Sequence, residues 1–260
     1  MAKLRLDQLL VQRGLVESRS LAQARILAGD VLVGGHPVTK AGAAVGEDAD
    51  LRLRGDAPPF VSRGGLKLAG GLDAFGIDPS GRVCFDAGAS TGGFTDCLLQ
   101  RGAAKVHAVD VGTNQLHWKL RSDPRVVSLE QTNLRLWDPA RIPERCSLLV
   151  ADLSFISLRL AIPPVLPSLS PGADAVLLVK PQFEAGPADV GKGGIVRDPA
   201  VRRRVCEEIW AFFAGTALRP RGLAQSPIPG GEGNVEFLLH ARLGAEAAAF
   251  PAGTDFGGEG

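Results

Sequence analysis

The chain has 260 residues, of which 45% are hydrophobic and 22% are charged, as in globular proteins with a substantial core. A net charge of only +1 excludes a strongly basic nucleic-acid binder, so contacts with nucleic acid would have to come from local patches. Four cysteines without a CxxC pair argue against a disulfide scaffold and a zinc site, and no apolar run reaches the roughly 18 residues of a membrane span. We expect a monomeric, cytoplasmic protein that binds neither metal nor membrane.

Residues 1–56 show the pattern of a small α+β domain. Leucines recur near helical spacing over residues 4–15 and again over 21–27. Ser18 is placed as the N-cap of the second helix, and Gly29 closes it. Short strands are predicted at 31–33 and 36–38, joined through Gly34-Gly35, a hairpin signal. The segment is therefore predicted to form two helices and a small sheet.

A second, larger domain follows Ala57-Pro58-Pro59, a linker signal that we extend over residues 57–64. After a helix at 66–75, apolar runs alternate with helical stretches, which predicts βαβ units and a parallel sheet over residues 65–244. Asp198-Pro199 begins a further helix, because an N-cap precedes proline at the first helical position. Strands are predicted at 83–85, 106–109, 126–129, 148–150, 175–179 and 235–241. Residues 245–260 are rich in Ala, Gly and Pro and are predicted to be a flexible tail.

A glycine-rich loop, residues 86–94, follows the first of these strands and opens a helix, as in nucleotide-binding folds. Asp110 ends the next strand, where an acidic residue can accept hydrogen bonds from both ribose hydroxyls of a nucleoside. The dinucleotide pattern GxGxxG requires glycine where Ser90 stands, and the loop carries no basic residue to meet a pyrophosphate. A nucleoside cofactor without phosphates fits better, and S-adenosylmethionine is the common one.

Ionisable residues also stand at strand ends. Asp152 and Lys180 each follow a buried strand, so in an open parallel sheet both face the ligand crevice beside Gly88. Glu236 begins the final strand and reaches the same edge if that strand is antiparallel to its neighbours. Lys67 lies on the helix that enters the domain, where spacing alone leaves its role open.

In order and context, Lys67, Asp152, Lys180 and Glu236 resemble the K-D-K-E tetrad of FtsJ-like RNA 2′-O-methyltransferases. The N-terminal segment is similar to an S4 RNA-binding domain, and the combination resembles the TlyA family, whose members are named hemolysin A or ribosomal RNA 2′-O-methyltransferase. The matching blocks are residues 61–67, 86–94, 152–155, 180–184 and 233–236. The resemblance implies a Rossmann-like methyltransferase with an S4 domain. It also implies transfer of a methyl group from S-adenosylmethionine to a ribose 2′-oxygen of a ribosomal RNA cytidine.

The same resemblance, read with general chemistry, assigns roles to the site residues. A 2′-hydroxyl must lose its proton to become a good nucleophile, and a nearby cation or burial favours a neutral lysine. We assign Lys180 as the general base, Asp152 as its orienting partner, and Glu236 as the residue that holds Lys67. The predicted cofactor-binding set is Asp86, Gly88, Ala89, Ser90, Thr91, Gly92, Gly93, Asp110, Asn133 and Asp152. The predicted RNA-binding set is Arg5, Arg13, Arg19, Arg25, Lys40, Arg63 and Phe155.

Two features of the RNA-binding set leave alternatives open. Residues 1–56 hold eight basic and seven acidic side chains, so each of these arginines and lysines could simply lie on a solvated face. Phe155 could stack on a displaced base or pack in the core. At the level of the whole chain, the alternatives to a methyltransferase are a non-catalytic RNA-binding ribosome factor and a pore-forming hemolysin, although no membrane-inserting segment is visible.

Overall fold

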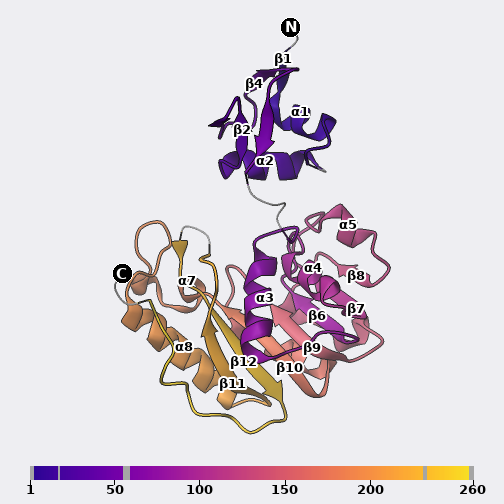
Figure 1. The fold of residues 1–260 in the computed structure, drawn as a ribbon. Helices are drawn as coiled ribbons and strands as arrows, with labels where there is room; N and C mark the ends of the chain where they lie inside the picture. The colour runs from indigo at the N-terminus through magenta and orange to yellow at the C-terminus, as the bar shows by residue number, and fades with distance from the viewer. Residues whose placement is uncertain (1–2, 17, 55–58, 231–232, 258–260) are drawn as a thin grey trace. The chain divides into compact units, whose positions relative to one another are not determined.

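The computed structural model describes residues 3–16, 18–54, 59–230 and 233–257 (Figure 1). The chain divides into two compact units, one up to residue 58 and one from Pro59 onward. Ala57 and Pro58, the core of the predicted linker, lie outside the described residues. The rest of that predicted linker belongs to the second unit, because the Val61 amide donates to Asp96 (2.8 Å) and Gln100 donates to the Pro59 carbonyl (2.8 Å).

The first unit is the predicted α+β domain. Its helices are α1 (Leu6–Gln12) and α2 (Arg19–Leu27). One antiparallel pair joins β1 (Lys3–Arg5) to β4 (Ala44–Gly46), and a three-stranded sheet has the order β3 (His36–Pro37), β2 (Val31–Val33), β5 (Leu51–Leu53). The two helices and the strands enclose a small core of Leu6, Leu9, Leu10, Val16, Ala22, Ile26, Val31 and Leu51.

Two local sequence signals in this unit, the Ser18 N-cap and the Gly34-Gly35 turn, have the predicted structures. The Ser18 side chain caps α2 by accepting a hydrogen bond from the Leu21 amide (3.3 Å). Gly34 and Gly35 both have positive φ, 57° and 82°, as a two-residue hairpin turn requires between Val33 and His36. The sequence did not predict β1, β4 and β5, because these three-residue strands lack the Gly-Gly turn signal that marks β2 and β3.

The second unit is built on one seven-stranded sheet in the order β11-β12-β10-β9-β6-β7-β8. Strands β6 to β10 are parallel, whereas β12 runs antiparallel between β10 and β11. This confirms the predicted Rossmann-like architecture, and the antiparallel β12 meets the condition under which its start reaches the edge where β9 and β10 end. The strands are β6 (Val83–Ala87), β7 (Lys105–Val109), β8 (Val126–Leu129), β9 (Cys146–Ala151), β10 (Leu169–Val179), β11 (Leu218–Gln225) and β12 (Phe237–Leu243).

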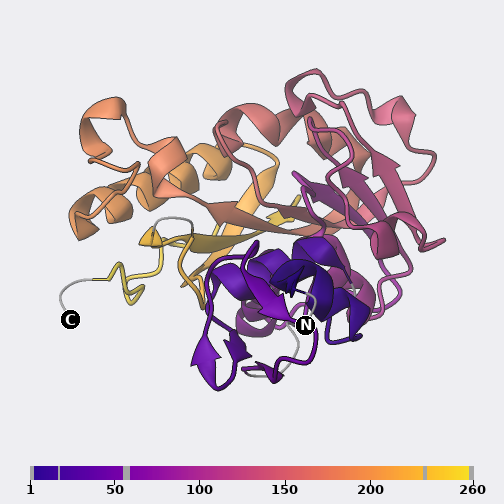
Figure 2. The same ribbon diagram turned by 90° about the horizontal axis from the view of Figure 1, so that it is seen from above.

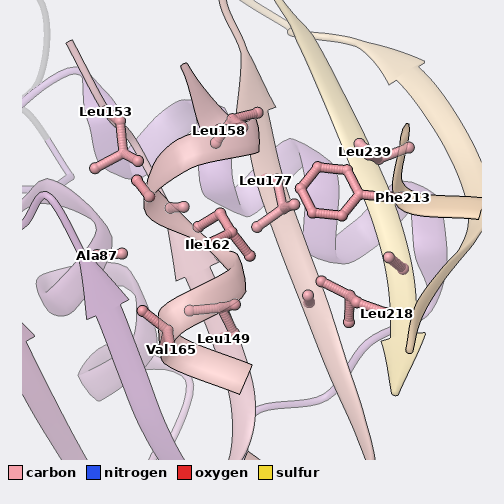
Figure 3. Close-up of a cluster of buried hydrophobic side chains, with 14 of the residues drawn as sticks. Ala87, Leu149, Leu153, Leu158, Ile162, Val165, Leu177, Phe213, Leu218 and Leu239 are labelled. Carbon is pink, nitrogen blue, oxygen red and sulfur yellow. The ribbon is translucent and has the colours of Figure 1, made fainter. Parts of the chain in front are cut away.

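Helices cover both faces of this sheet (Figure 2). On one face, α3 (Gly64–Phe75) and α4 (Gly93–Gln100) pack against Cys84, Leu148 and Val176. On the other, α6 (Leu158–Ala161), η3 (Pro163–Ser168) and α8 (Pro199–Ala214) enclose the larger core. Figure 3 shows part of this second layer, with Phe213 of α8 beside Leu177 and Leu239 of the sheet. The shorter helices are α5 (Trp118–Arg121), α7 (Pro181–Glu184), η1 (Leu134–Leu136), η2 (Pro139–Arg141) and η4 (Pro187–Asp189).

Two features of this unit differ from the sequence-based expectation. Edge strand β11 was not predicted, because Pro220 and Gly222 interrupt its apolar pattern and mark the irregular register with β12. The described part of the predicted flexible tail packs on the core: the Phe250 ring meets Trp210 (5.4 Å between centroids) and Phe256 meets Phe237 (5.1 Å). Among the described residues, no helix is both long and apolar enough to cross a membrane.

Candidate active site

A pocket of about 260 Å³ opens where the sheet reverses its strand order, between the carboxyl ends of β6 and β9. Ligands of open α/β sheets bind at this switch point, because the loops after the two strands diverge there. The glycine-rich loop after β6, the loop after β9, the residue after β10 and the start of α3 all contribute walls. The lining residues are Ser62, Arg63, Gly64, Lys67, Gly88, Ala89, Ser90, Thr91, Gly93, Phe94, Asp152, Ser154, Lys180, Pro229 and Gly230.

The glycine-rich loop is shaped by close packing beneath it. Gly88 has φ 83°, and a Cβ atom there would lie 2.5 Å from the Asp152 carbonyl oxygen. A Cβ atom on Gly93 would collide with the Ser62 hydroxyl and with the backbone of α3. Any side chain at either position would therefore push the loop away from the strand ends, so the sequence needs glycine there.

Two aspartates, Asp86 at the end of β6 and Asp110 after β7, support this loop. Asp86 is fully buried, and its Oδ2 accepts a hydrogen bond from the Thr95 hydroxyl (2.6 Å), while Oδ1 has no hydrogen-bond partner in the described structure. Burial raises the pKa of Asp86 to about 7. Asp110 accepts from the Ser90 amide (2.8 Å) and from the Gly112 amide (2.7 Å), so this carboxylate braces the loop.

The four residues of the predicted tetrad form two lysine–carboxylate pairs beside the pocket. Lys67 Nζ donates to Glu236 Oε2 at 2.5 Å, and the two side chains are only 10% and 2% exposed. Lys180 Nζ lies 2.5 Å from Asp152 Oδ1, with exposures of 11% and 22%. The pairing joins α3 to the start of β12 and the end of β10 to the end of β9. Each lysine thus faces its own carboxylate, and both lysines line the same pocket.

Further contacts tie the loop after β9 to the segment after β10. Lys180 Nζ donates to Ser154 Oγ (3.1 Å), and the Phe155 ring lies 5.0 Å from the Phe183 ring. Glu184 accepts from the Ser157 hydroxyl (2.5 Å) and from the Leu158 amide (2.7 Å). Burial raises the pKa of Glu184, although these donors oppose the shift. These contacts therefore join the loop that carries Asp152 to the segment that follows Lys180.

Phe155 and Arg63, two members of the predicted RNA-binding set, lie at this site. Phe155 is 91% exposed and has φ 63°, a left-handed conformation that is uncommon for a bulky residue. This excludes the alternative in which Phe155 packs in the core. The exposed Arg63 lines the pocket and donates to the Pro229 carbonyl (2.7 Å).

In the first unit, buried Asp7 organises two of the predicted phosphate-binding arginines. Its carboxylate accepts from Arg5 Nε (3.0 Å), from Arg19 Nε (2.9 Å) and from Gln23 (2.9 Å). The two arginines remain 47% and 52% exposed, so each keeps donors that face solvent. These hydrogen bonds, above all those from Arg5, hold the pKa of Asp7 well below its usual range.

Arg25 does not fit the role that the sequence predicts for it. Its side chain is 4% exposed, donates to the Arg54 carbonyl (2.7 Å) and lies 3.6 Å from Asp30. Arg25 is thus a structural residue, because the guanidinium holds α2 against the end of β5 and offers no face to a phosphate. Lys40 and Arg13 are exposed, and Arg13 donates to the Ala49 carbonyl (2.6 Å) and to the Glu47 carbonyl.

Three members of the predicted cofactor-binding set lie outside the pocket lining, besides Asp86. They are Gly92, Asp110 and Asn133. Asn133 is exposed and caps η1 by accepting from the Arg135 amide (3.0 Å).

Conversely, sequence reasoning missed Ser62, Ser154 and Gly230. Gly230 packs so closely on the Glu236 carboxylate that a Cβ atom there would overlap it. Ser62 and Ser154 lie inside the matched blocks 61–67 and 152–155, and Gly230 lies three residues before the block 233–236.

The fold and the pocket define an FtsJ-like methyltransferase preceded by an S4 domain. The FtsJ-like methyltransferase family model matches residues 60–243, and the S4 domain model matches residues 4–51. The 16S/23S rRNA (cytidine-2′-O)-methyltransferase TlyA of Mycobacterium tuberculosis is 47% identical over 252 residues, which cover 96% of this chain and 94% of TlyA. Hemolysin A of Brachyspira hyodysenteriae is 41% identical over 91% of this chain and 99% of its own length.

A solved protein from Streptococcus thermophilus that carries the name hemolysin superposes with a TM-score of 0.76 at 42% identity, covering 97% of this chain and 92% of that one. The chain therefore belongs to the TlyA family.

Proposed function

We propose that this chain transfers a methyl group from S-adenosylmethionine to the 2′-oxygen of a cytidine ribose in ribosomal RNA. The observation that carries the proposal is the pair of lysine–carboxylate contacts, Lys67–Glu236 and Lys180–Asp152, set around one pocket at the switch point of a Rossmann-like sheet. The similarity to TlyA of Mycobacterium tuberculosis, whose name specifies cytidine 2′-O-methylation of 16S and 23S rRNA, supports the same substrate.

The residues of the pocket fit the proposed cofactor. The loop around Gly88 leaves space where a side chain would stand, so backbone can approach a ligand closely. Buried Asp86 keeps an unpartnered Oδ1 beneath this loop, and Asp110 has lone pairs left beyond the two amides that it accepts. When bound, S-adenosylmethionine supplies an activated methyl group on a cationic sulfonium. Gly88, Ala89, Ser90, Thr91 and Gly93 would hold it, with Asp110 and Asn133 at the edge.

Lys180 serves as the general base in this proposal. A ribose hydroxyl holds its proton near neutral pH, so a group within hydrogen-bond reach must accept that proton as the oxygen is methylated. Lys180 Nζ borders the pocket and is held by Asp152, which fixes the position of the amine. Lys67 is paired with Glu236, whose carboxylate is only 2% exposed, and these two residues position the ribose beside Lys180.

RNA contacts complete the proposed function. The exposed Phe155 ring packs on Phe183, whose ring centroid lies 5.8 Å from Lys180 Nζ, so Phe155 offers a stacking surface for a base that leaves its helix. Arg63 adds a cation to the rim of the pocket. In the S4 domain, Arg5, Arg13, Arg19 and Lys40 are the proposed phosphate contacts.

The test measures radiolabelled methyl transfer from S-adenosylmethionine to separated ribosomal subunits. We expect the wild-type chain to label ribosomal RNA, and Lys180→Ala to lose about 10²–10⁴-fold in rate, as loss of a general base does, with nearly unchanged cofactor affinity. Lys105→Ala is the matched control, because Lys105 is also paired to a carboxylate (Glu144, 2.7 Å) but lies at the amino end of β7. A Lys180→Ala enzyme that keeps more than about a tenth of the wild-type rate would exclude Lys180 as the base.

A further inference from the structure

The Glu236 carboxylate has a second donor, Gln182, which lies outside the lysine–carboxylate tetrad. Lys67 Nζ donates to Glu236 Oε2 at 2.5 Å, and Gln182 Nε2 donates to Oε1 at 3.4 Å. The orientation of this amide follows from the charge of Glu236, because the reverse orientation would bring two acceptor oxygens together. Gln182 belongs to α7 and stands two residues after Lys180, so it comes from the same segment as the proposed base.

Gln182 reaches Glu236 at the point where the backbone pairing of their strands has ended. The ladder between β10 and β12 ends at the pair Val179–Phe237, and Lys180 and Glu236 are the first residues beyond it. Among the described residues, no backbone hydrogen bond joins the segment after Val179 to the segment before Phe237. The side-chain bond from Gln182 therefore continues the tie between the two segments past the end of the ladder.

The surroundings of this contact make it hard to replace. The Glu236 side chain is 2% exposed, and a Cβ atom on Gly230 would lie 2.1 Å from Oε1, so protein closes another side of that oxygen. A buried oxygen that loses its donor is destabilised where water has little access to it. Loss of the amide would therefore let the Glu236 carboxylate turn away from its position against Lys67.

We propose that Gln182 is a positioning residue that fixes the Lys67–Glu236 pair relative to Lys180. This inference rests on the proposed function and deepens it, because Lys67 and Glu236 position the ribose beside Lys180 in that proposal. The Gln182 amide binds the carboxylate of one pair, and its backbone continues from the lysine of the other, so the two pairs share one frame. A change in the spacing between them would displace the ribose from the base and lower the rate of the bound complex.

The test compares Gln182→Met with the wild type in single-turnover and steady-state methyl transfer to ribosomal subunits. Methionine has a similar length and no donor, so we expect kcat to fall about two- to tenfold, as the loss of one hydrogen bond does. KM for RNA and the affinity for S-adenosylmethionine should stay at wild-type values, because the described lining of the pocket does not include Gln182. Gln100→Met is the matched control and should keep wild-type kcat, since Gln100 also donates to a carboxylate (Asp96, 3.0 Å) but ends α4.

Gln182→Glu separates a hydrogen bond from a packing contact. The side chain keeps its size, and its carboxyl can donate to Glu236 only while it is protonated. Two ion pairs stand around it, Lys67–Glu236 and Lys180–Asp152, and the like charge of Glu236 in direct contact favours the protonated form. We expect this variant to be faster than Gln182→Met at mildly acidic pH. It should lose that advantage as the pH rises, because two carboxylates then face each other.

The outcomes separate this inference from the function on which it rests. Full kcat in Gln182→Met, or a loss that appears in KM alone, would overturn the positioning role and leave Lys180 as the base. A Gln182→Glu enzyme no faster than Gln182→Met at mildly acidic pH would also overturn it, with rates taken per folded protein from thermal unfolding at the same pH. A wild-type chain that transfers no methyl group would refute the proposed function, and the role of Gln182 with it.

Discussion

Removing one partner of the Lys67–Glu236 pair should destabilise the second unit far more than removing both. Both side chains are almost fully buried, and Nζ lies 2.5 Å from Oε2. Lys67→Met would leave the Glu236 carboxylate without its main counter-charge, and Gly230 packs too closely on that carboxylate to let water replace it freely. A buried charge that loses its partner costs about 3–5 kcal/mol. For a unit of this size, that loss lowers Tm by roughly 6–20 °C.

The double variant Lys67→Met/Glu236→Gln should recover much of this loss, because neither charge remains buried alone. Replacing a buried ion pair by neutral groups of similar volume is often close to neutral in stability. Thermal and urea unfolding followed by tryptophan fluorescence would measure the cycle. Trp118, Trp137 and Trp210 all lie in the second unit, so this signal reports on that unit alone.

The exposed pair Arg203–Glu207 on α8 is the matched control. Its side chains are 58% and 44% exposed at 2.8 Å, and such helix-surface pairs contribute only about 0.3–0.5 kcal/mol. The two single variants, Lys67→Met and Glu236→Gln, each lower the free energy of unfolding. If these two losses simply add in the double variant, with a coupling energy no larger than in the surface pair, the view that the two buried charges depend on each other would be refuted. Lys67→Met, Glu236→Gln and the double variant should all be inactive in methyl transfer as well, since each loses the proposed positioning of the ribose.

Two further predictions follow from single residues. The folded state raises the pKa of Asp86 to about 7 from an ordinary value of 3.8, so its contribution to stability is full below about pH 4 and is lost as the pH rises through 7. Asp86→Asn should therefore flatten the dependence of Tm on pH between about pH 4 and pH 7. A variant with the same pH dependence of Tm as the wild type would contradict the raised pKa of Asp86. In the S4 domain, Arg25→Ala should speed hydrogen exchange across α2 without changing the salt dependence of RNA binding. Lys40→Ala should lower the slope of log K for RNA binding against log salt concentration by roughly one, with hydrogen exchange unchanged. If Arg25→Ala changed the salt slope and Lys40→Ala changed hydrogen exchange instead, the structural role of Arg25 and the phosphate contact of Lys40 would both be refuted.

The sequence predicted which residues the site contains better than how they are joined. Asp152 and Lys180 were predicted from their place after buried strands, because the carboxyl ends of parallel strands share one edge. Lys67 and Glu236 stand 169 positions apart, and only the packing of α3 beside β12 brings them to 2.5 Å. No local pattern encodes that contact, so it was predicted from resemblance alone.

The failures have a common physical origin in tertiary contacts that override local signals. The composition of the C-terminal segment suggests a flexible tail, yet Phe250 and Phe256 find apolar partners, and Arg202 donates to the Phe256 carbonyl (2.9 Å). Arg25 has the sequence context of an exposed helix residue, but it lies where α2 meets the end of β5. In both cases the decisive partner is remote in sequence, and periodicity does not report it.

The carboxylates of the two ion pairs differ in burial, which bears on the roles proposed for the two lysines. A base must exchange its proton with solvent between turnovers, which favours the pair with the more accessible partner. Asp152 is 22% exposed beside the pocket, whereas Glu236 is 2% exposed and closed in by Gly230. Lys180 Nζ also donates to Ser154 Oγ (3.1 Å), and both residues line the pocket. Under the proposed function, this difference supports Lys180 as the base and Lys67 as the residue that positions the ribose with Glu236, a distinction that composition and spacing alone do not make.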